Sequence, residues 1–133
     1  MLIRDIAQIL QLNGIGTIGV DIFLGHLPDS PDNTVVLFST GGFPQELPLP
    51  DVRMTAQVMV RDKSYRAAYE RIWRIYNLLD GGDRGRFIQA PSGRRMVAQA
   101  LQPPQTLQEG GKLDDESGRP LFVFNLSVWT NRD

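Results

Sequence analysis

The sequence predicts an α+β domain: two helices packed on a mainly antiparallel sheet of about five strands, with projecting loops or hairpin arms. Three observations support this class. Apolar residues recur with helical spacing in two segments, whereas several other segments alternate between apolar and polar residues, as strands do. A strand–helix–strand step occurs once, so a regularly alternating α/β fold is not expected. With 133 residues, the chain has the length of one domain, 1–133.

The N-terminal third predicts a short helix and two strands. Apolar residues in 2–10 have helical spacing, and Asn13-Gly14 ends that pattern. Residues 17–24 are β-branched or bulky and predict the first strand. The segment 28–33 is rich in Pro, Asp and Ser and predicts a turn before a second strand at 34–40. We expect these two strands to pair as a hairpin.

The central third predicts an arm, a strand and a long helix. Residues 43–51 are rich in proline, which lacks the amide donor that a central strand needs, so they should form an extended surface arm. Residues 54–61 alternate as a strand does. Residues 65–79 carry the strongest helical periodicity of the chain, and Asp62 or Ser64 can cap that helix.

The C-terminal third predicts strands on either side of a second arm. Residues 87–88 and 95–100 are expected strands, joined by a turn at 91–93. Residues 102–119 are polar and rich in Gly and Pro, and they predict a long loop or a hairpin arm. The clearest alternation in the chain, at 122–129, predicts the final strand.

Composition excludes several kinds of chemistry. The chain has no cysteine and a single histidine, His26. Disulfides, thiol nucleophiles and cysteine-based zinc sites are therefore excluded, and a metal site with two imidazoles is excluded as well. We expect a protein that is not an enzyme, with no catalytic residue, no metal and no cofactor.

The charge of the chain is small overall but unevenly distributed. The net charge is −1 and the pI is about 5.8, so no overall basic field attracts nucleic acid. Residues 1–60 hold two basic and six acidic side chains, a net charge of −4. Residues 61–95 hold nine basic and four acidic side chains (+5), and residues 96–133 hold three basic and five acidic side chains (−2). This layout fits partners of opposite local charge, and it also fits an ordinary solvated surface.

Targeting signals are not expected. The first residues are charged where a signal peptide needs an apolar run, and no window approaches eighteen consecutive apolar residues. We therefore expect a soluble protein of a reducing cytoplasm, without contact to a membrane.

Two glycine-rich segments resemble nucleotide-binding motifs in composition but not in context. Residues 14–19 match GxGxxG, but a helix precedes them and a strand follows, the reverse of the dinucleotide-binding order. Residues 81–86 follow a helix and lack the Lys-Ser/Thr ending of a phosphate loop. Both are interpreted as turns. The acidic run 114–116 lacks the ligand spacing of a calcium loop and is interpreted as solvated charge.

Three sequence segments, in the order in which they occur along the chain, give it a resemblance to a family of phage proteins. A strand from Leu37 ends in Thr40-Gly41-Gly42-Phe43-Pro44, the sequence Gln57-Val58-Met59-Val60-Arg61-Asp62 follows, and the long helix carries Ala67-Ala68, Ile75-Tyr76 and Leu78-Leu79. This order is similar to the minor capsid or tail-terminator (tail completion) proteins of long-tailed bacteriophages, over most of the chain.

The resemblance implies a structural role in the virion. Members form a ring, usually a hexamer, on the head-proximal end of the tail tube. The ring stops tube polymerisation and joins the tail to the head-completion complex, while DNA passes through its lumen without specific binding. The implied partners are other copies of the chain, the tail tube protein and a head-completion or connector protein, with assembly in the host cytoplasm.

The expected interface residues lie on the two arms and in the arginine-rich turn. They are Phe43, Glu46, Leu47, Arg84, Arg86, Arg94, Leu113, Asp114, Asp115 and Glu116. Three other functions remain open. One is a head–tail connector or adaptor of the neck. Another is a small ligand-binding or enzymatic domain that uses His26 and the arginine-rich turn. The third is a nucleic-acid-binding domain whose basic patch is Arg84, Arg86, Arg94 and Arg95.

Overall fold

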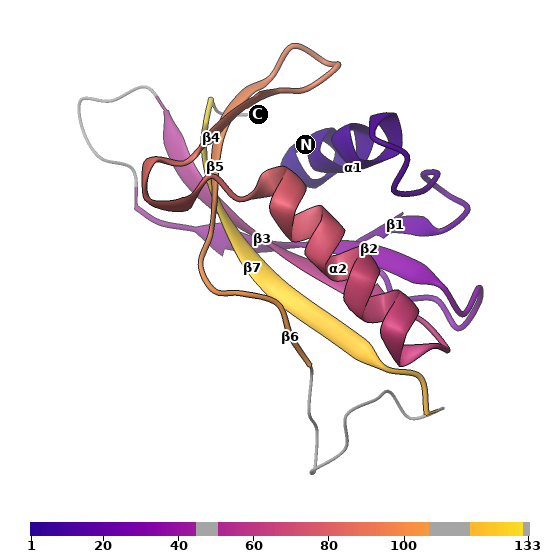
Figure 1. Ribbon diagram of the computed structural model, residues 1–133. Coiled ribbons are helices and arrows are strands. Elements are labelled where there is room, and N and C mark those ends of the chain that lie inside the picture. The colour runs from indigo at the N-terminus through magenta and orange to yellow at the C-terminus, as the bar shows by residue number, and fades with distance from the viewer. Residues whose placement is uncertain (45–50, 107–117, 132–133) are drawn as a thin grey trace.

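The computed structural model describes residues 1–44, 51–106 and 118–131, and folds them into two α-helices, one 3₁₀ turn and a seven-stranded sheet (Figure 1). The elements are α1 (Leu2–Leu12), β1 (Ile22–Leu24), β2 (Thr34–Gly42), β3 (Val52–Arg61), α2 (Tyr65–Leu79), η1 (Gly82–Arg84), β4 (Arg86–Gln89), β5 (Arg95–Ala100), β6 (Gln105–Thr106) and β7 (Leu121–Thr130). The expected α+β class is confirmed, with more strands than the five expected.

The strands follow the order β1-β2-β3-β7-β5-β4, with β6 beside β7. All pairs are antiparallel except β1 with β2. The long strands β3 and β7 form the centre of the sheet and pair along their full length, from Val52 opposite Thr130 to Arg61 opposite Leu121. The sheet is therefore mixed, but mainly antiparallel.

The expected hairpin between the first two strands is wrong. Ile22 and Leu24 lie opposite Val35 and Leu37 in a parallel register. The extended stretch is also shorter than 17–24, because the amides of Val20, Asp21 and Ile22 all donate to the Thr17 carbonyl and so form a turn. The segment 25–33 then carries the chain back to the start of β2, and the two strands run in the same direction.

The polar segment 102–119 contains a short strand of its own. Gln105 and Thr106 form β6, which lies opposite Val123 and Phe122 of β7. Strand β5 does not continue directly into β6, because Pro103 and Pro104 between them have no amide hydrogen for the ladder. Of the two expectations for this segment, a long loop or a hairpin arm, the pairing of residues 105–106 with β7 agrees with the hairpin. Residues 107–117 lie outside the described residues.

Both helices pack on the same face of the sheet (Figure 1). The predicted inner face of α2 is confirmed at Ala68, Ile72, Ile75 and Leu79, which are buried. Helix α2 begins at the expected cap, where the Ser64 side chain accepts from the Ala67 amide at 3.2 Å. These residues pack against core residues of α1 and the sheet, which include Ile6, Leu10, Val58, Val60, Phe124 and Leu126.

The N-terminal end of α2 is less buried than its periodicity predicts. Tyr65 and Tyr69 are 52% and 46% exposed. Their rings nevertheless contact Phe122 edge-on, with centroids 5.1 and 6.0 Å apart. These tyrosines therefore form the rim of the core rather than its interior.

The glycine-rich segment 14–19 is a structural turn, as the reversed order of elements predicted. The Arg71 guanidinium donates to the Ile15 carbonyl at 2.7 Å and forms an ion pair with Asp21 at 2.9 Å. A Cβ on Gly16 would lie 2.6 Å from the Asp21 carboxylate and 2.8 Å from Arg71. Glycine is needed here so that the ion pair can approach the backbone.

Candidate assembly surface

The sheet face opposite the helices carries a row of aromatic and apolar side chains across four strands. Cross-strand pairs place Phe87 of β4 beside Val97 of β5, Val97 beside Trp129 of β7, and Trp129 beside Arg53 of β3. The Arg53 guanidinium lies 4.0 Å from the centre of the Phe43 ring, a cation–π contact. We call Phe43, Arg53, Trp129, Val97 and Phe87 the aromatic row.

The Gly-Gly-Phe segment positions Phe43 on this row. The pairing of β2 with β3 shifts register between Ser39 and Gly42, and Gly41 has a positive φ of 89°. A Cβ on Gly42 would meet the Arg53 carbonyl oxygen. The glycines thus permit a β-bulge, after which the Phe43 amide donates to the Arg53 carbonyl at 2.9 Å. The motif that supported the family resemblance therefore has a local structural reason.

Much of the row is accessible to a partner. Phe87 is 64% exposed and Phe43 is 45% exposed, whereas Trp129 and Val97 are partly buried. Arg53 is held in place because its Nε donates to the Ser127 hydroxyl at 2.7 Å. Exposed aromatic residues and arginine are enriched at protein–protein interfaces, so this composition is typical of a docking surface.

A hollow of about 290 Å³ lies at the Phe87 end of the row. Its lining is more polar than apolar and combines an acid, a base and an amide with aromatic and apolar side chains of three strands: Asp51, Phe87, Arg95, Met96, Val97, Trp129 and Asn131. A hollow of this size and lining can receive a side chain of a partner protein.

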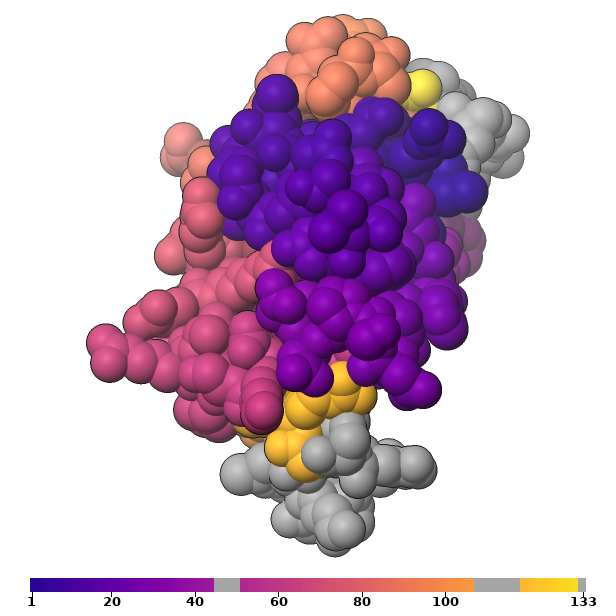
Figure 2. All heavy atoms as spheres, turned by 90° about the vertical axis from the view of Figure 1, so that its right-hand side faces the viewer, coloured from indigo at the N-terminus to yellow at the C-terminus, as the bar shows by residue number. Residues whose placement is uncertain are grey.

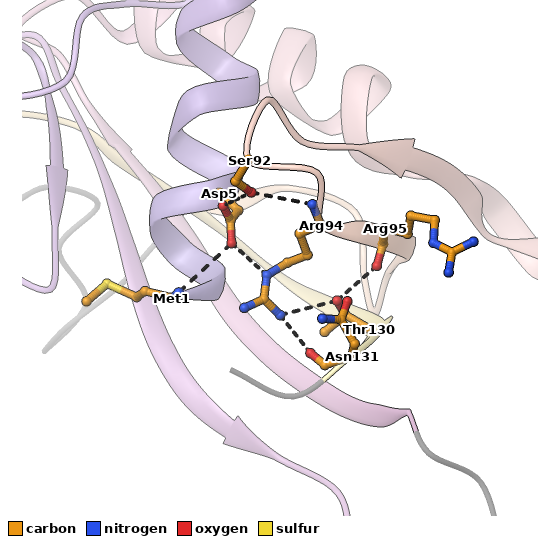
Figure 3. A network of polar contacts seen from close by, with 7 residues as sticks. All are labelled: Met1, Asp5, Ser92, Arg94, Arg95, Thr130 and Asn131. Carbon is orange, nitrogen blue, oxygen red and sulfur yellow. Dashed lines mark hydrogen bonds and ion pairs between the residues drawn. The ribbon is translucent and has the colours of Figure 1, made fainter.

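The four arginines of the predicted basic patch do not share one surface. Arg94 turns toward α1, whereas Arg95 points away from it (Figure 3). Arg86 lies by the end of α2, where its Nε donates to the Asp80 carbonyl at 3.3 Å. Arg84 is exposed in η1. The geometry therefore gives no single basic patch for a nucleic-acid backbone.

Arg94 instead joins three elements inside the protein (Figure 3). Its Nε lies 2.6 Å from the Asp5 carboxylate of α1, and the two side chains are only 8% and 9% exposed. The same carboxylate accepts from Ser92 at 2.6 Å, and a second Arg94 nitrogen donates to the Asn131 carbonyl at 2.8 Å. This network connects α1 to the β4–β5 turn and to the end of β7.

The predicted interface residues fall into four groups. Phe43 lies on the aromatic row, and Arg84 and Arg86 are exposed at the start of β4. Arg94 takes part in the internal network. The remaining six lie outside the described residues: Glu46, Leu47, Leu113, Asp114, Asp115 and Glu116.

Sequence reasoning missed four members of the aromatic row, namely Arg53, Phe87, Val97 and Trp129. The alternation of the strands already placed Val97 and Trp129 opposite the core face. The missing information was the strand order, which brings them together.

Asp80 connects the end of α2 to two neighbouring segments. Its Oδ1 accepts from the Ala100 amide at 2.9 Å and the Gly82 amide at 3.1 Å. Burial by itself raises the pKa of Asp80, but these bonds, a bond from the Tyr76 hydroxyl and the charge of Arg86 together lower it below 3.8. The pKa of Tyr76 is raised by burial and by its bond to the negative Asp80.

We expect Asp80→Asn to destabilise the protein by about 1–2 kcal/mol at neutral pH, because the amide is a weaker acceptor than the carboxylate. A lowered folded-state pKa stabilises the fold above the unfolded value of 3.8 and loses that effect as pH falls through the folded value. The difference between wild type and variant should therefore shrink below pH 3.8 in denaturant titrations. The exposed neighbour Asp83, changed to Asn, is the control; a difference that persists unchanged in acid would contradict the assignment.

No group of His, Asp and Glu within residues 1–44, 51–106 and 118–131 could hold a metal ion. Among the same residues, no helix has the length and apolar character needed to cross a membrane. His26 is exposed at the end of β1.

Comparison with known proteins identifies the family. A family model described as bacteriophage tail terminator protein matches residues 9–130, nearly the whole chain. The chain belongs to the bacteriophage tail terminator family. The terminator is thus a structural phage tail protein, and its family implies contacts with other tail or head proteins of the virion.

Solved structures with a similar fold include one that matches nearly the whole chain. It covers 99% of this chain and 95% of its own length, with a TM-score of 0.56 and 12% sequence identity. A search of curated proteins finds no significant match.

Proposed function

We propose that the chain caps the head-proximal end of the tail tube as a ring, stops tube polymerisation and joins the tail to the head-completion complex. The match to the tail terminator family over residues 9–130 carries this proposal. The ring contains several copies, by the family resemblance six, and DNA passes through its lumen. Assembly takes place in the host cytoplasm, and the ring remains in the virion tail.

The aromatic row is our candidate for the surface that binds the tail tube protein. A cap must bind the tube end in place of the next tube subunit, so it needs a contact with a substantial apolar centre. Phe43 and Phe87 supply exposed rings, and the hollow beside Trp129 can receive a side chain from the tube. Well-packed aromatic residues at the centre of an interface commonly dominate its binding energy.

The direct test adds the protein to polymerising tail tube protein of the same phage and images tube lengths and ends by electron microscopy. Capping predicts shorter tubes with a ring at one end. Tubes of unchanged length with bare ends would contradict the terminator role. If such tubes occur together with binding to the head-completion protein, the neck adaptor becomes the better assignment.

We expect Phe87→Ala to weaken capping by at least ten-fold without loss of folding, since the ring is exposed and contributes little to the core. The measurement is the protein concentration that halves mean tube length. Tyr65→Ala is the matched control, because Tyr65 is 52% exposed but lies on α2, on the helix-covered side of the sheet. Equal effects of the two variants would show that the aromatic row does not bind the tube.

A further inference from the structure

Strand β4 is an open edge of the sheet. It comes last in the strand order and pairs only with β5, within the part of the chain that the structure describes. Its residues Arg86, Phe87 and Gln89 are exposed. Among the described strands at the margins of the sheet, β4 is also the longest, since β1 has three residues and β6 has two. An edge strand with free amide and carbonyl groups is a template for pairing with a strand of another chain.

The hydrogen-bond pattern shows which backbone groups of β4 face outward. The Ala90 amide donates to the Arg94 carbonyl at 2.8 Å, so these two residues form a hydrogen-bonded pair of the β4–β5 hairpin. Bonded and non-bonded pairs alternate along an antiparallel ladder. Ile88 therefore bonds to β5, whereas the amides and carbonyls of Phe87 and Gln89 point away from β5. No described residue pairs with these four groups, so they are available to an added strand.

The opposite margin of the sheet, at β1, is closed by the chain itself. The Asp21 carbonyl faces β2, where it accepts from the Val35 amide at 2.7 Å, so the backbone groups of the next residue, Ile22, face away from β2. The Ile22 amide donates to the Thr17 carbonyl at 3.1 Å, and the Ile22 carbonyl accepts from the Gly19 amide at 2.9 Å. Figure 2 shows α1 and the purple segments after it forming a continuous surface on this side. A strand added along β1 would have to break these bonds, whereas one added at β4 would not.

The β4 edge carries no net charge. Arg84 and Arg86 at its start are balanced by Asp80 and Asp83, and the Arg86 Nε donates to the Asp80 carbonyl at 3.3 Å. Charge therefore does not select the partner. The free backbone groups select an extended segment, and Phe87, which is 64% exposed, selects an apolar side chain beside it.

We infer that a strand of the tail tube protein adds to β4 and pairs with the backbone groups of Phe87 and Gln89. Phe87 belongs both to this edge and to the aromatic row. Residues directly opposite each other on paired strands have Cβ atoms about 5 Å apart, so an added strand would extend the aromatic row by one side chain. The inference rests on the proposed function and names the backbone contact by which the aromatic row and its edge hold the tube.

Symmetry argues against another copy of the chain as the occupant of the edge. Two β4 strands that pair with each other form a two-fold contact, which ends at a dimer, whereas a ring joins two different surfaces of neighbouring copies. Among the other described margins, β1 is closed and β6 has only two residues. The continuity of the edge with the aromatic row therefore favours the tube protein.

Proline at position 89 tests the backbone contact. Gln89→Pro removes one outward amide and places a ring at the edge, but it leaves the bonds of Ile88 and Ala90 to β5, and an edge strand tolerates proline at such a position. Gln89→Thr changes the same side chain and keeps the amide. Both variants are first checked for wild-type thermal unfolding. Each is then added to polymerising tube protein, and the protein concentration that halves mean tube length is measured.

Strand addition predicts that Gln89→Pro weakens capping by about ten-fold or more, and by several-fold more than Gln89→Thr does, because main-chain hydrogen bonds supply much of the affinity of an added strand. Capping by Gln89→Pro at the wild-type concentration would overturn the inference. Equal losses in the two variants would overturn it as well, since the side chain would then be responsible and not the backbone.

Amide hydrogen exchange tests the same contact in the wild-type chain, and it decides the question if Gln89→Pro does not fold. In the protein alone, the amides of Phe87 and Gln89 should exchange faster than those of Ile88 and Ala90. On tube ends, exchange at Phe87 and Gln89 should slow by about ten-fold or more. Exchange that is unchanged on tubes would overturn the inference. Protection that already appears when the chain self-associates without tubes would assign the edge to another copy and overturn it too.

The outcomes separate this inference from the proposed function. If the wild-type chain caps tubes and Gln89→Pro caps them equally well, the terminator role stands and only the strand addition is removed. If the wild-type chain leaves tube lengths unchanged, the terminator role itself is contradicted, whatever the variants do.

Discussion

Ile72→Asp is expected to unfold the domain. Ile72 is 0% exposed on the face of α2 that packs on the sheet, and it belongs to the main core. A carboxylate at this position would lose its hydration with no partner, at a cost of at least about 4 kcal/mol. This is a large part of the roughly 5–15 kcal/mol that stabilises an ordinary domain. Circular dichroism and thermal melting would detect the loss.

Asn77→Asp supplies the matched control for this prediction. It introduces the same carboxylate into the same helix at an exposed position, where a change within about 0.5 kcal/mol is usual. A cooperatively folded Ile72→Asp protein with a near-normal melting temperature would show that the buried face of α2 is assigned wrongly.

Asp5→Ala is expected to cost about 3–5 kcal/mol, the second largest effect. The substitution removes the carboxylate that Arg94 and Ser92 contact. The side chains of Asp5 and Arg94 are both less than a tenth exposed. The Arg94 charge would then be partly buried without the Asp5 carboxylate beside it. Denaturant titration would measure the change in the free energy of unfolding.

A double variant tests whether the cost of Asp5→Ala comes from the Arg94 charge that it leaves behind. Asp5→Leu combined with Arg94→Met should be more stable than Asp5→Ala alone, because no uncompensated charge remains. Glu70→Ala is the exposed control, since the Arg66–Glu70 pair is 88% and 63% exposed and should contribute less than about 1 kcal/mol. If Asp5→Ala costs no more than Glu70→Ala, the network does not hold α1 to the sheet.

These two predictions differ in how far the sequence alone supports them. The periodicity of 65–79 already placed Ile72 inward, because the buried face of a helix is set by residues three and four apart. The Asp5–Arg94 pair joins residues separated by 89 positions. Its formation depends on where α1 and the β4–β5 turn meet, and no local pattern encodes that.

The candidate assembly surface also combines a residue that the sequence predicted with residues that only the strand order brings together. Phe43 was predicted at an interface, and its glycine-rich motif positions it over Arg53. Phe87 and Trp129 become neighbours of that pair only through the order β3-β7-β5-β4. Arg94 and Arg95 are adjacent in sequence, yet Arg94, in the turn before β5, is engaged with Asp5, whereas Arg95, the first residue of β5, is exposed.

The sequence by itself determined the kinds of element, most of their positions, the α+β class and the resemblance to tail terminators. These features depend on local propensity, periodicity and turn chemistry, which neighbouring residues specify. Only the tertiary structure decided the parallel pairing of β1 with β2, the composition of the aromatic row and the internal role of Arg94. Each of these requires segments far apart in the chain to meet, and their pairing is chosen by the energy of the whole packed core.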